Sequence, residues 1–320
     1  FGESDEFFGG SLEDRLAGYG QGNGGAPAAF SCLSALIINA YRRMGHGAKL
    51  TSSYMSRLFI LAAVMYVDDT DLLHWGSDMF MEDEDLVEEA QEATDDFAML
   101  AQASGGAVKP EKCFAYFLTY HTVNGKTKLK TLKKLPEVKS LVEVKQKNGE
   151  IALESAHLSV PQPDGSRAWF ATKDVDTPME MLGVHFAPGS AGNGVHHIKA
   201  MTGKGEEWVD RLKSRPLPTR DAWLSFRYQL TPGMKYGLTT AIIAPSKLHK
   251  LMGALYYRVL PLLGVNRCIT REWRLLTKEF QGLGLPDFCV EAFASKVFYL
   301  MRHIGFDGAV GEMMQQAYEA

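Results

Sequence analysis

The segment AAVMYVDDTDLLHW (Ala62–Trp75) places Asp68 and Asp69 side by side between two apolar runs. Adjacent carboxylates repel each other, and burying one without a partner is costly in free energy. The simplest interpretation is a turn in which both side chains reach water. Because the flanking runs Arg57–Met65 and Thr70–Trp75 have the length of strands, the sequence predicts a tight hairpin with both carboxylates at its tip.

Two carboxylates at a hairpin tip can also hold a metal ion. Hard divalent cations take oxygen ligands, and Mg²⁺ usually takes only one or two protein carboxylates together with substrate phosphates. Metal ions held in this way serve phosphoryl-transfer chemistry. Asp68 and Asp69 are therefore the candidate metal ligands of this sequence.

The composition is that of an ordinary globular protein with 320 residues, 46% hydrophobic and 22% charged, which is long enough for two domains. The net charge of −4 means that any nucleic-acid surface must be local. Widely spaced cysteines without a CxxC pair argue against a zinc site or a disulfide framework and favour a reducing compartment. They are Cys32, Cys113, Cys268 and Cys289. No apolar run approaches the ~18 residues of a membrane span.

Helices are predicted on both sides of the Asp-Asp hairpin. Residues 28–45 carry apolar side chains at helical spacing and end at Gly45. Their predicted apolar face consists of Phe30, Leu33, Ile37, Ala40, Tyr41 and Met44. Glu82–Gly106 is predicted to be an amphipathic helix with a solvated acidic face. Its predicted buried face consists of Leu86, Ala90, Ala93, Phe97 and Leu100.

The segments that follow alternate between turns and strands. Eight lysines lie between Lys126 and Lys147, which indicates either a solvated surface hairpin, with its turn at Lys147–Glu150, or a phosphate contact. Pro161–Ser166 is predicted to be a turn, and Met179–Pro188 a strand pair bent at Gly183. The loop at residues 189–194 is a plausible domain boundary, and from about Lys199 the pattern is helical.

The order of these segments resembles that of the reverse transcriptases, especially those of retrotransposons without long terminal repeats. YVDD at 66–69 matches the family's Tyr-x-Asp-Asp hairpin, and GYGQGNGGAP at 18–27 looks like its Gln-Gly loop. SGGAVKPEKC at 104–113 is similar to its Gly-x-x-x-Asn-x-x-Lys segment, with Lys109 in place of Asn. MLGV at 181–184 resembles the primer-grip turn, and GLGLPDF at 282–288 a downstream segment.

The resemblance implies an α+β fold. A partial polymerase palm, an antiparallel sheet with helices, would occupy residues 1–193, and an α-helical thumb or connection region residues 194–320. It also implies RNA-directed DNA synthesis by two-metal nucleotidyl transfer, with Mg²⁺ or Mn²⁺ as cofactor. The partners would be an RNA template, a DNA primer and deoxynucleoside triphosphates, with no membrane. The setting would be intracellular, and the resemblance suggests nuclear action.

Site residues are carried over from the matching motifs. Asp68 and Asp69 would bind the metal ions, and Lys112 would neutralise or protonate the departing pyrophosphate. The nucleotide and the nucleic acid would contact the Gln-Gly loop, the hairpin and the primer-grip turn. The residues concerned are Gln21, Gly22, Tyr66, Leu182 and Gly183.

One departure from the family bears on activity. The family carries a further bridging Asp on a strand well upstream of the Gln-Gly loop, whereas only Asp5 and Asp14 precede the loop here, and neither follows an apolar strand. Since the sequence opens at Phe1 rather than at Met, we expect a fragment that lacks the fingers and the first palm segment of the same polypeptide. We expect this chain alone to be inactive.

Three other interpretations stay open. A viral-type RNA-dependent RNA polymerase shares the palm, but Gln21-Gly22 argues against it. A non-catalytic nucleic-acid-binding relic of a retroelement, or a domesticated protein, would keep the lysines and the thumb helices and would tolerate Asp68→Ala. The third is an unrelated α+β domain with a chance Asp-Asp turn.

Overall fold

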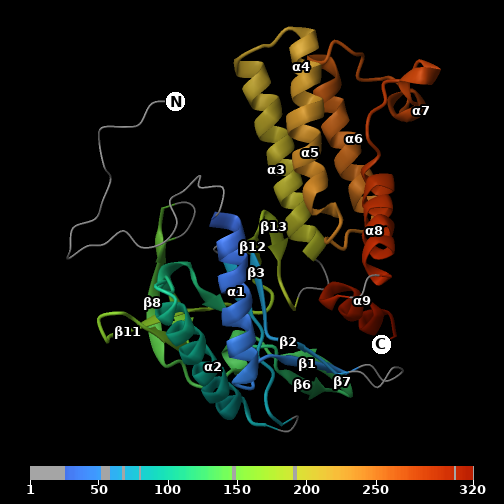
Figure 1. Cartoon of the computed structure of the whole chain (residues 1–320). Coiled ribbons are helices and arrows are strands. Elements are labelled where there is room, and N and C mark those ends of the chain that lie inside the picture. The colour runs from blue at the N-terminus through green and yellow to red at the C-terminus, as the bar shows by residue number, and fades with distance from the viewer. Residues whose placement is uncertain are drawn as a thin grey trace, which may run out of the picture. The chain divides into compact units, whose positions relative to one another are not determined.

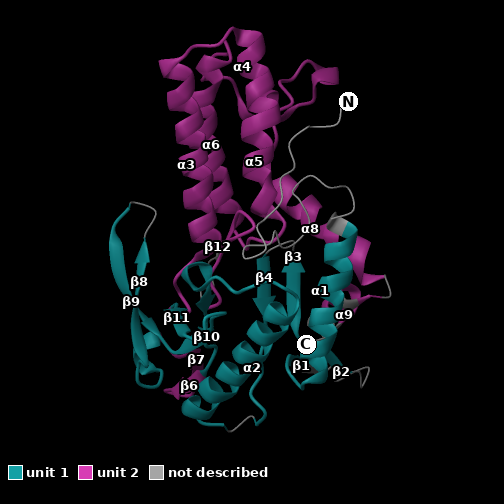
Figure 2. Cartoon of the chain, turned by 60° about the vertical axis from the view of Figure 1, so that its left-hand side comes forward, with its two compact units in different colours: residues 1–119, 132–173, 319–320 teal, residues 120–131, 174–318 magenta. Residues whose placement is uncertain are grey.

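The structure is a computed structural model that describes residues 26–51, 58–66, 69–78, 81–145, 149–189, 193–305 and 308–319. Helices and small, mostly antiparallel sheets alternate along the chain, which confirms the predicted α+β class at that level (Figure 1). The chain divides into two compact units (Figure 2). Unit 1 covers residues 1–119, 132–173 and 319–320, and unit 2 covers residues 120–131 and 174–318. The predicted regions 1–193 and 194–320 do not coincide with these units, and their identity as palm and thumb stays a prediction.

Unit 1 combines two long helices with short strands. Its helical elements are α1 (Ala26–Arg43), α2 (Asp83–Ala103), η1 (Pro110–Lys112) and η2 (Leu132–Lys134). Its strands are β1 (Ala48–Thr51), β2 (Leu58–Leu61), β3 (Ala63–Tyr66), β4 (Asp69–Leu72), β5 (Phe114–Ala115), β8 (Ser140–Lys145), β9 (Ile151–Ala156), β10 (Leu158–Pro161) and β11 (Arg167–Thr172). Antiparallel pairs join β1 to β2, β3 to β4, β8 to β9 and β10 to β11, and β5 runs parallel to β11.

The apolar run Arg57–Met65 was predicted to be one strand, and the structure divides it. The first part, β2, pairs with β1, and the second, β3, pairs with β4. Ala62 separates them and is only 3% exposed, although its carbonyl still accepts a hydrogen bond from the Leu73 N–H at 3.0 Å. Gly47 passes so close that a Cβ there would lie 2.9 Å from the Cα of Ala62. The strand therefore changes its partner where the backbone of another segment packs against it.

Both predicted helices of unit 1 form where the sequence indicates. Helix α1 ends just before Gly45, whose φ of +99° is left-handed and suits glycine. Helix α2 begins after Glu82, with acidic residues in its first turn that favour the helix dipole. The predicted buried faces are only partly right, because Tyr41 is buried but Leu33 and Met44 are exposed.

Helix α2 contributes to both hydrophobic clusters of unit 1. One cluster joins Val87 and Ala98 of α2 to strands β10 and β11. It contains Val87, Ala98, Phe117, Leu158, Val160 and Phe170. The smaller cluster brings Ala93 against Tyr41 of α1 and Ala62 beside β3. Since it packs against both groups, α2 fixes the hairpin β3–β4 relative to the rest of unit 1.

Unit 2 is mainly helical, as predicted from Lys199 onward. Its helical elements are α3 (Asn193–Ser214), α4 (Thr219–Ser225), η3 (Phe226–Leu230), α5 (Thr231–Lys235), η4 (Tyr236–Leu238), α6 (Pro245–Leu262), α7 (Arg271–Leu275), η5 (Lys278–Phe280), α8 (Phe288–Ile304) and α9 (Ala309–Glu319). Figure 1 shows α3, the continuous run from α4 to η4, and α6 side by side. Their core holds Trp208, Phe226, Met234, Tyr256 and Leu260.

Two hairpins complete unit 2. They are β6 (Tyr120–Val123) with β7 (Lys126–Leu129), and β12 (Met179–Met181) with β13 (Val184–Phe186). Positive φ values at Asn124 and Gly125, and at Leu182 and Gly183, give each hairpin a two-residue turn of the type that matches strand twist. The bend predicted at Gly183 is confirmed. The Asn-Gly turn was not predicted, although Asn-Gly is itself a strong hairpin signal.

Two further turns were predicted. Strands β8 and β9 pair on either side of the predicted turn at Lys147–Glu150, with Lys145 opposite Ile151, and residues 146–148 lie outside the described part of the chain. Strands β10 and β11 are joined at Pro161–Ser166, where Gly165 has a φ of +82°.

Within the described residues, no helix combines the length and the apolarity that crossing a membrane requires.

Candidate functional site

The hairpin β3–β4 carries the Asp-Asp motif. Met65 pairs with Thr70 and Tyr66 with Asp69, so two residues, Val67 and Asp68, connect the strands. These two residues lie outside the described part of the chain. Asp69 is exposed at the first position of β4. The predicted tight hairpin is confirmed, with Asp69 at its end.

A second carboxylate accompanies Asp69 on β4. Asp69 and Asp71 are two residues apart and therefore project from the same face of the strand. Partial burial, together with the charge of Asp69, raises the pKa of Asp71 above its ordinary value. Asp71 is not among the predicted site residues, although the alternation Asp-Thr-Asp indicates it. Carboxylate oxygens are the ligands that hard divalent cations prefer, so Mg²⁺ as cofactor stays a prediction for this strand.

The predicted primer-grip residues Leu182 and Gly183 form the turn between β12 and β13 in unit 2. Leu182 has a φ of +48° and is 47% exposed, so a large apolar side chain is held at a turn in a backbone conformation that favours glycine or asparagine. A Cβ on Gly183 would lie 3.5 Å from the ring of Tyr236, which is itself 61% exposed. The turn and this tyrosine thus form one exposed apolar surface.

The remaining predicted site residues are Gln21, Gly22, Tyr66 and Lys112. Gln21 and Gly22 lie outside the described residues. Tyr66 ends β3 opposite Asp69 in the strand register. Lys112 ends η1 and is exposed, and its N–H donates a hydrogen bond to the Lys109 carbonyl at 3.1 Å. Asp69, Tyr66 and Lys112 belong to unit 1, and Leu182 and Gly183 to unit 2.

The described lysines of residues 126–145 belong to two different units, and Lys147 lies outside the described residues. Lys126 and Lys128 lie on β7 in unit 2, and because they are two residues apart they project from the same face of that strand. Lys139 and Lys145 lie just before and at the end of β8 in unit 1. The exposed side chains on β8 and β9 also include Leu141, Glu143, Ile151 and Leu153, so that hairpin is as apolar as it is basic.

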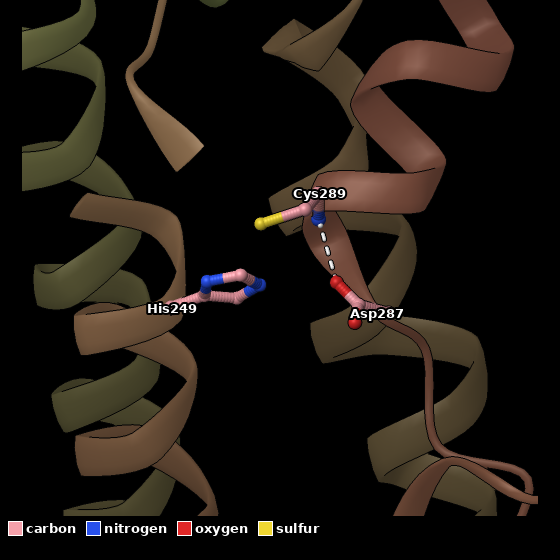
Figure 3. A group of neighbouring side chains, drawn as sticks. All are labelled: His249, Asp287 and Cys289. Carbon is pink, nitrogen blue, oxygen red and sulfur yellow. Dashed lines mark hydrogen bonds between the residues drawn. The ribbon is translucent and has the colours of Figure 1, made fainter. Parts of the chain in front are cut away.

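A group of side chains that was not predicted from the sequence lies in unit 2 beside the start of α8. His249 on α6 faces Asp287 and Cys289 (Figure 3), and their ligand atoms all lie within 4.8 Å of one another. The Asp287 Oδ1 caps α8 by accepting a hydrogen bond from the Cys289 N–H at 2.9 Å. Although burial works against it, this bond and the contact with Arg271 lower the pKa of Asp287. Burial and the nearby Asp287 raise the pKa of the Cys289 thiol.

Sequence spacing gave no sign of this group because His249 and Asp287 are far apart in the chain. The segment 282–288 explains how they meet. Gly282 packs against the Leu276 carbonyl. Leu285 and Phe288 are buried in the core of unit 2. The Pro286 carbonyl accepts a hydrogen bond from the Tyr256 hydroxyl. Because these contacts anchor the segment, Asp287 lies beside His249 of α6.

Comparison with known proteins adds no assignment, since neither a family model nor a curated protein matches this chain.

Proposed function

We propose that this chain is part of an RNA-directed DNA polymerase of the reverse-transcriptase type and that it binds an RNA template paired with a DNA primer. The observation that carries the proposal is the hairpin β3–β4, whose register leaves two residues between Tyr66 and Asp69 and exposes the Asp69 carboxylate. The flanking helices, α1 before and α2 after, follow the order of the family's palm.

Each site residue has a role in this proposal. Asp68 and Asp69 would hold Mg²⁺ or Mn²⁺, and Asp71 beside them adds to the negative field that attracts it. When bound, the metal ions supply charge stabilisation at the reacting phosphate and lower the pKa of the primer hydroxyl. Lys112 would contact the pyrophosphate portion, and Gln21 with Gly22 the incoming nucleotide.

The turn at Leu182 and Gly183 would seat the end of the primer. Support comes from the exposed leucine, the glycine that permits close approach, and the adjoining ring of Tyr236. Apolar and aromatic surfaces of this kind contact the sugar and base faces of nucleic acid, while phosphates are bound by cations. The side chains of Lys126 and Lys128 are exposed and suited to that second role.

The proposal is tested by measuring the affinity of the chain for a fluorescent RNA–DNA primer–template at several salt concentrations. We expect affinity to fall steeply as salt rises, because counterions are released from the phosphates. We also expect Mg²⁺ and the complementary deoxynucleoside triphosphate together to tighten binding. Asp69→Ala should remove this tightening, and Glu88→Ala, on the exposed side of α2, should not. Affinity that ignores salt, or tightening that survives Asp69→Ala, would contradict the proposal.

A non-catalytic nucleic-acid-binding protein is the second candidate. It is favoured by the exposed lysines of β7, which lie outside the Asp-Asp hairpin. In that case Lys126→Glu combined with Lys128→Glu would weaken duplex binding, while Asp69→Ala would change neither the affinity nor its dependence on Mg²⁺. The same titration therefore separates the two candidates.

A further inference from the structure

Two hydrogen-bond acceptors in unit 2 point at a single cation, the Arg271 guanidinium. The Nη2 of Arg271, the first residue of α7, lies 3.0 Å from the Nε2 of His249 and 3.0 Å from the Oδ2 of Asp287. A guanidinium has only donors, so His249 presents the lone pair of a neutral imidazole to it. The carboxylate and the imidazole thus converge on one positive charge.

A thiol completes the group. The Cys289 Sγ lies within 4.8 Å of the ligand atoms of both His249 and Asp287. Nitrogen, oxygen and sulfur donors in one group are the combination that Zn²⁺ accepts, since it binds histidine, carboxylate and cysteine ligands. We propose that His249, Asp287 and Cys289 form a Zn²⁺ site in which the metal takes the place of the Arg271 guanidinium.

The ligand geometry is close to what zinc requires. Tetrahedral zinc with bonds of about 2.0–2.3 Å places its ligand atoms about 3.3–3.8 Å apart, so ligand atoms that lie within 4.8 Å of one another need to approach by no more than about 1.5 Å. His249 is exposed, and side-chain rotation can provide this movement. As the zinc–sulfur bond forms, the thiol proton leaves to solvent. Three protein ligands leave a fourth position for water, which is the arrangement of an open zinc site.

The surroundings already orient the ligands. The Asp287 Oδ1 accepts a hydrogen bond from the N–H of Cys289. Its Oδ2 is therefore directed at the Arg271 guanidinium, whose place the metal would take. Such hydrogen bonds to a ligating carboxylate are the usual support of a metal site. The side chain of Arg271 is 52% exposed, so it can move into solvent when the metal enters.

The first test is a titration of the full chain with Co²⁺, a spectroscopic substitute for Zn²⁺, in a thiol-free reductant. We expect one equivalent to produce a thiolate-to-cobalt charge-transfer band and an excess of Zn²⁺ to abolish it. Cys289→Ser should remove the band, and His249→Ala should weaken binding at least tenfold. Asp287→Asn should also weaken binding while preserving the helix cap, because asparagine caps as well as aspartate does. Cys268→Ser, which changes an exposed cysteine, is the matched control and should keep the band.

The second test uses Arg271. If the guanidinium and the metal compete for the same acceptors, Arg271→Ala will tighten Co²⁺ and Zn²⁺ binding several-fold. If instead the four residues form only a structural clamp, Arg271→Ala will lower the melting temperature and leave metal binding absent or unchanged. That result overturns the proposal, as does a cobalt band that persists in Cys289→Ser. Circular dichroism of each variant, compared with the unsubstituted chain, verifies that it is folded.

Discussion

The side chain of Gln91 on α2 pairs with the backbone of Ser159 on β10 in the way a neighbouring strand would. Its Oε1 accepts a hydrogen bond from the Ser159 N–H at 2.9 Å, and its Nε2 donates to the Ser159 carbonyl at 2.7 Å. Strand β10 lies at the edge of the sheet β10-β11-β5. One glutamine therefore satisfies backbone groups at an unpaired sheet edge, which protects that edge from pairing with other chains.

We predict that Gln91→Ala destabilises the chain by about 1–3 kcal/mol, because it leaves the partly buried Ser159 N–H without a partner and leaves the Ser159 carbonyl with only its 3.3 Å hydrogen bond from the Arg167 Nη2. Gln91→Glu should have a smaller effect of the same sign, since it keeps the acceptor and loses the donor. Urea unfolding monitored by circular dichroism measures both changes. Glu92→Ala, at the exposed neighbouring position, is the control and should change stability by less than about 0.5 kcal/mol. Equal stability of Gln91→Ala and Glu92→Ala would contradict the prediction.

A second prediction concerns Gly282. A Cβ there would lie 2.0 Å from the Leu276 carbonyl oxygen, so the backbone must shift to admit it. Gly282→Ala should destabilise unit 2 by about 1–3 kcal/mol, as overpacking does. Gly253→Ala should have the opposite sign and stabilise by up to about 1 kcal/mol, because Gly253 lies within α6 with no heavy atom near its Cβ position. Thermal unfolding of the two variants tests the pair, and a stabilising Gly282→Ala would show that the contact is absent.

The turn at Leu182 gives a prediction in which stability and binding move in opposite directions. Leu182 has a φ of +48°, a conformation that costs a leucine about 1–2 kcal/mol and an asparagine less. Leu182→Asn creates the Asn-Gly pair preferred in such turns and should raise the melting temperature. If the turn seats a primer, the same substitution should weaken duplex binding because it removes the exposed apolar side chain. Gly183→Ala should lower the melting temperature, since Gly183 has a φ of +77°. A variant Leu182→Asn that is less stable than the parent would contradict the strain argument.

Acid should destabilise unit 1 through His157. The ring is fully buried, its Nε2 donates to the Pro136 carbonyl at 3.2 Å, and its Nδ1 lies 3.0 Å from the Thr172 hydroxyl. Burial, with the nearby Lys139, lowers the pKa of His157 despite the bond to Pro136. Because the folded pKa lies below the unfolded value of about 6.5, the unfolded chain binds the proton more readily. The stabilising contribution of the neutral ring is therefore complete above about pH 6.5 and is lost as the pH falls through the folded pKa.

His157→Gln isolates this contribution. Its free energy of unfolding should depend less on pH between about 7 and 5 than that of the parent chain, even though the substitution lowers stability at pH 7. Denaturant unfolding at a series of pH values provides the measurement, with His196→Gln as the control at a partly exposed position. An unchanged pH dependence in His157→Gln would show that other groups, such as His74 and His197, account for the acid sensitivity. The pKa values of both are also lowered, first of all by burial.

Local chemistry made much of the fold predictable. The hairpin at Tyr66 and Asp69, the bend at Gly183 and the ends of α1 and α2 depend on residues only a few positions apart. Turn residues and the period of apolar side chains encode such features directly. The candidate site at Asp69 was predictable for the same reason, whereas its role in polymerisation depends on the resemblance and stays a prediction.

Features that depend on distant segments were not predictable in this way. The sequence did not indicate that the run Arg57–Met65 changes partner at Ala62, because that change is imposed by Gly47 and by the packing of Tyr41 and Ala93. Nor did it indicate that the lysine-rich stretch is divided between two units.

Periodicity and turn chemistry over short stretches of sequence therefore sufficed to predict the Asp-Asp hairpin and the helical second half. Tertiary packing, in contrast, brings the ligand atoms of His249, Asp287 and Cys289 within 4.8 Å of one another. The physical reason is that this contact arises when the segment 282–288 is anchored by Leu285, Phe288 and the Tyr256 hydroxyl against α6. Packing of that kind sums over many buried contacts, and no short stretch of sequence contains it.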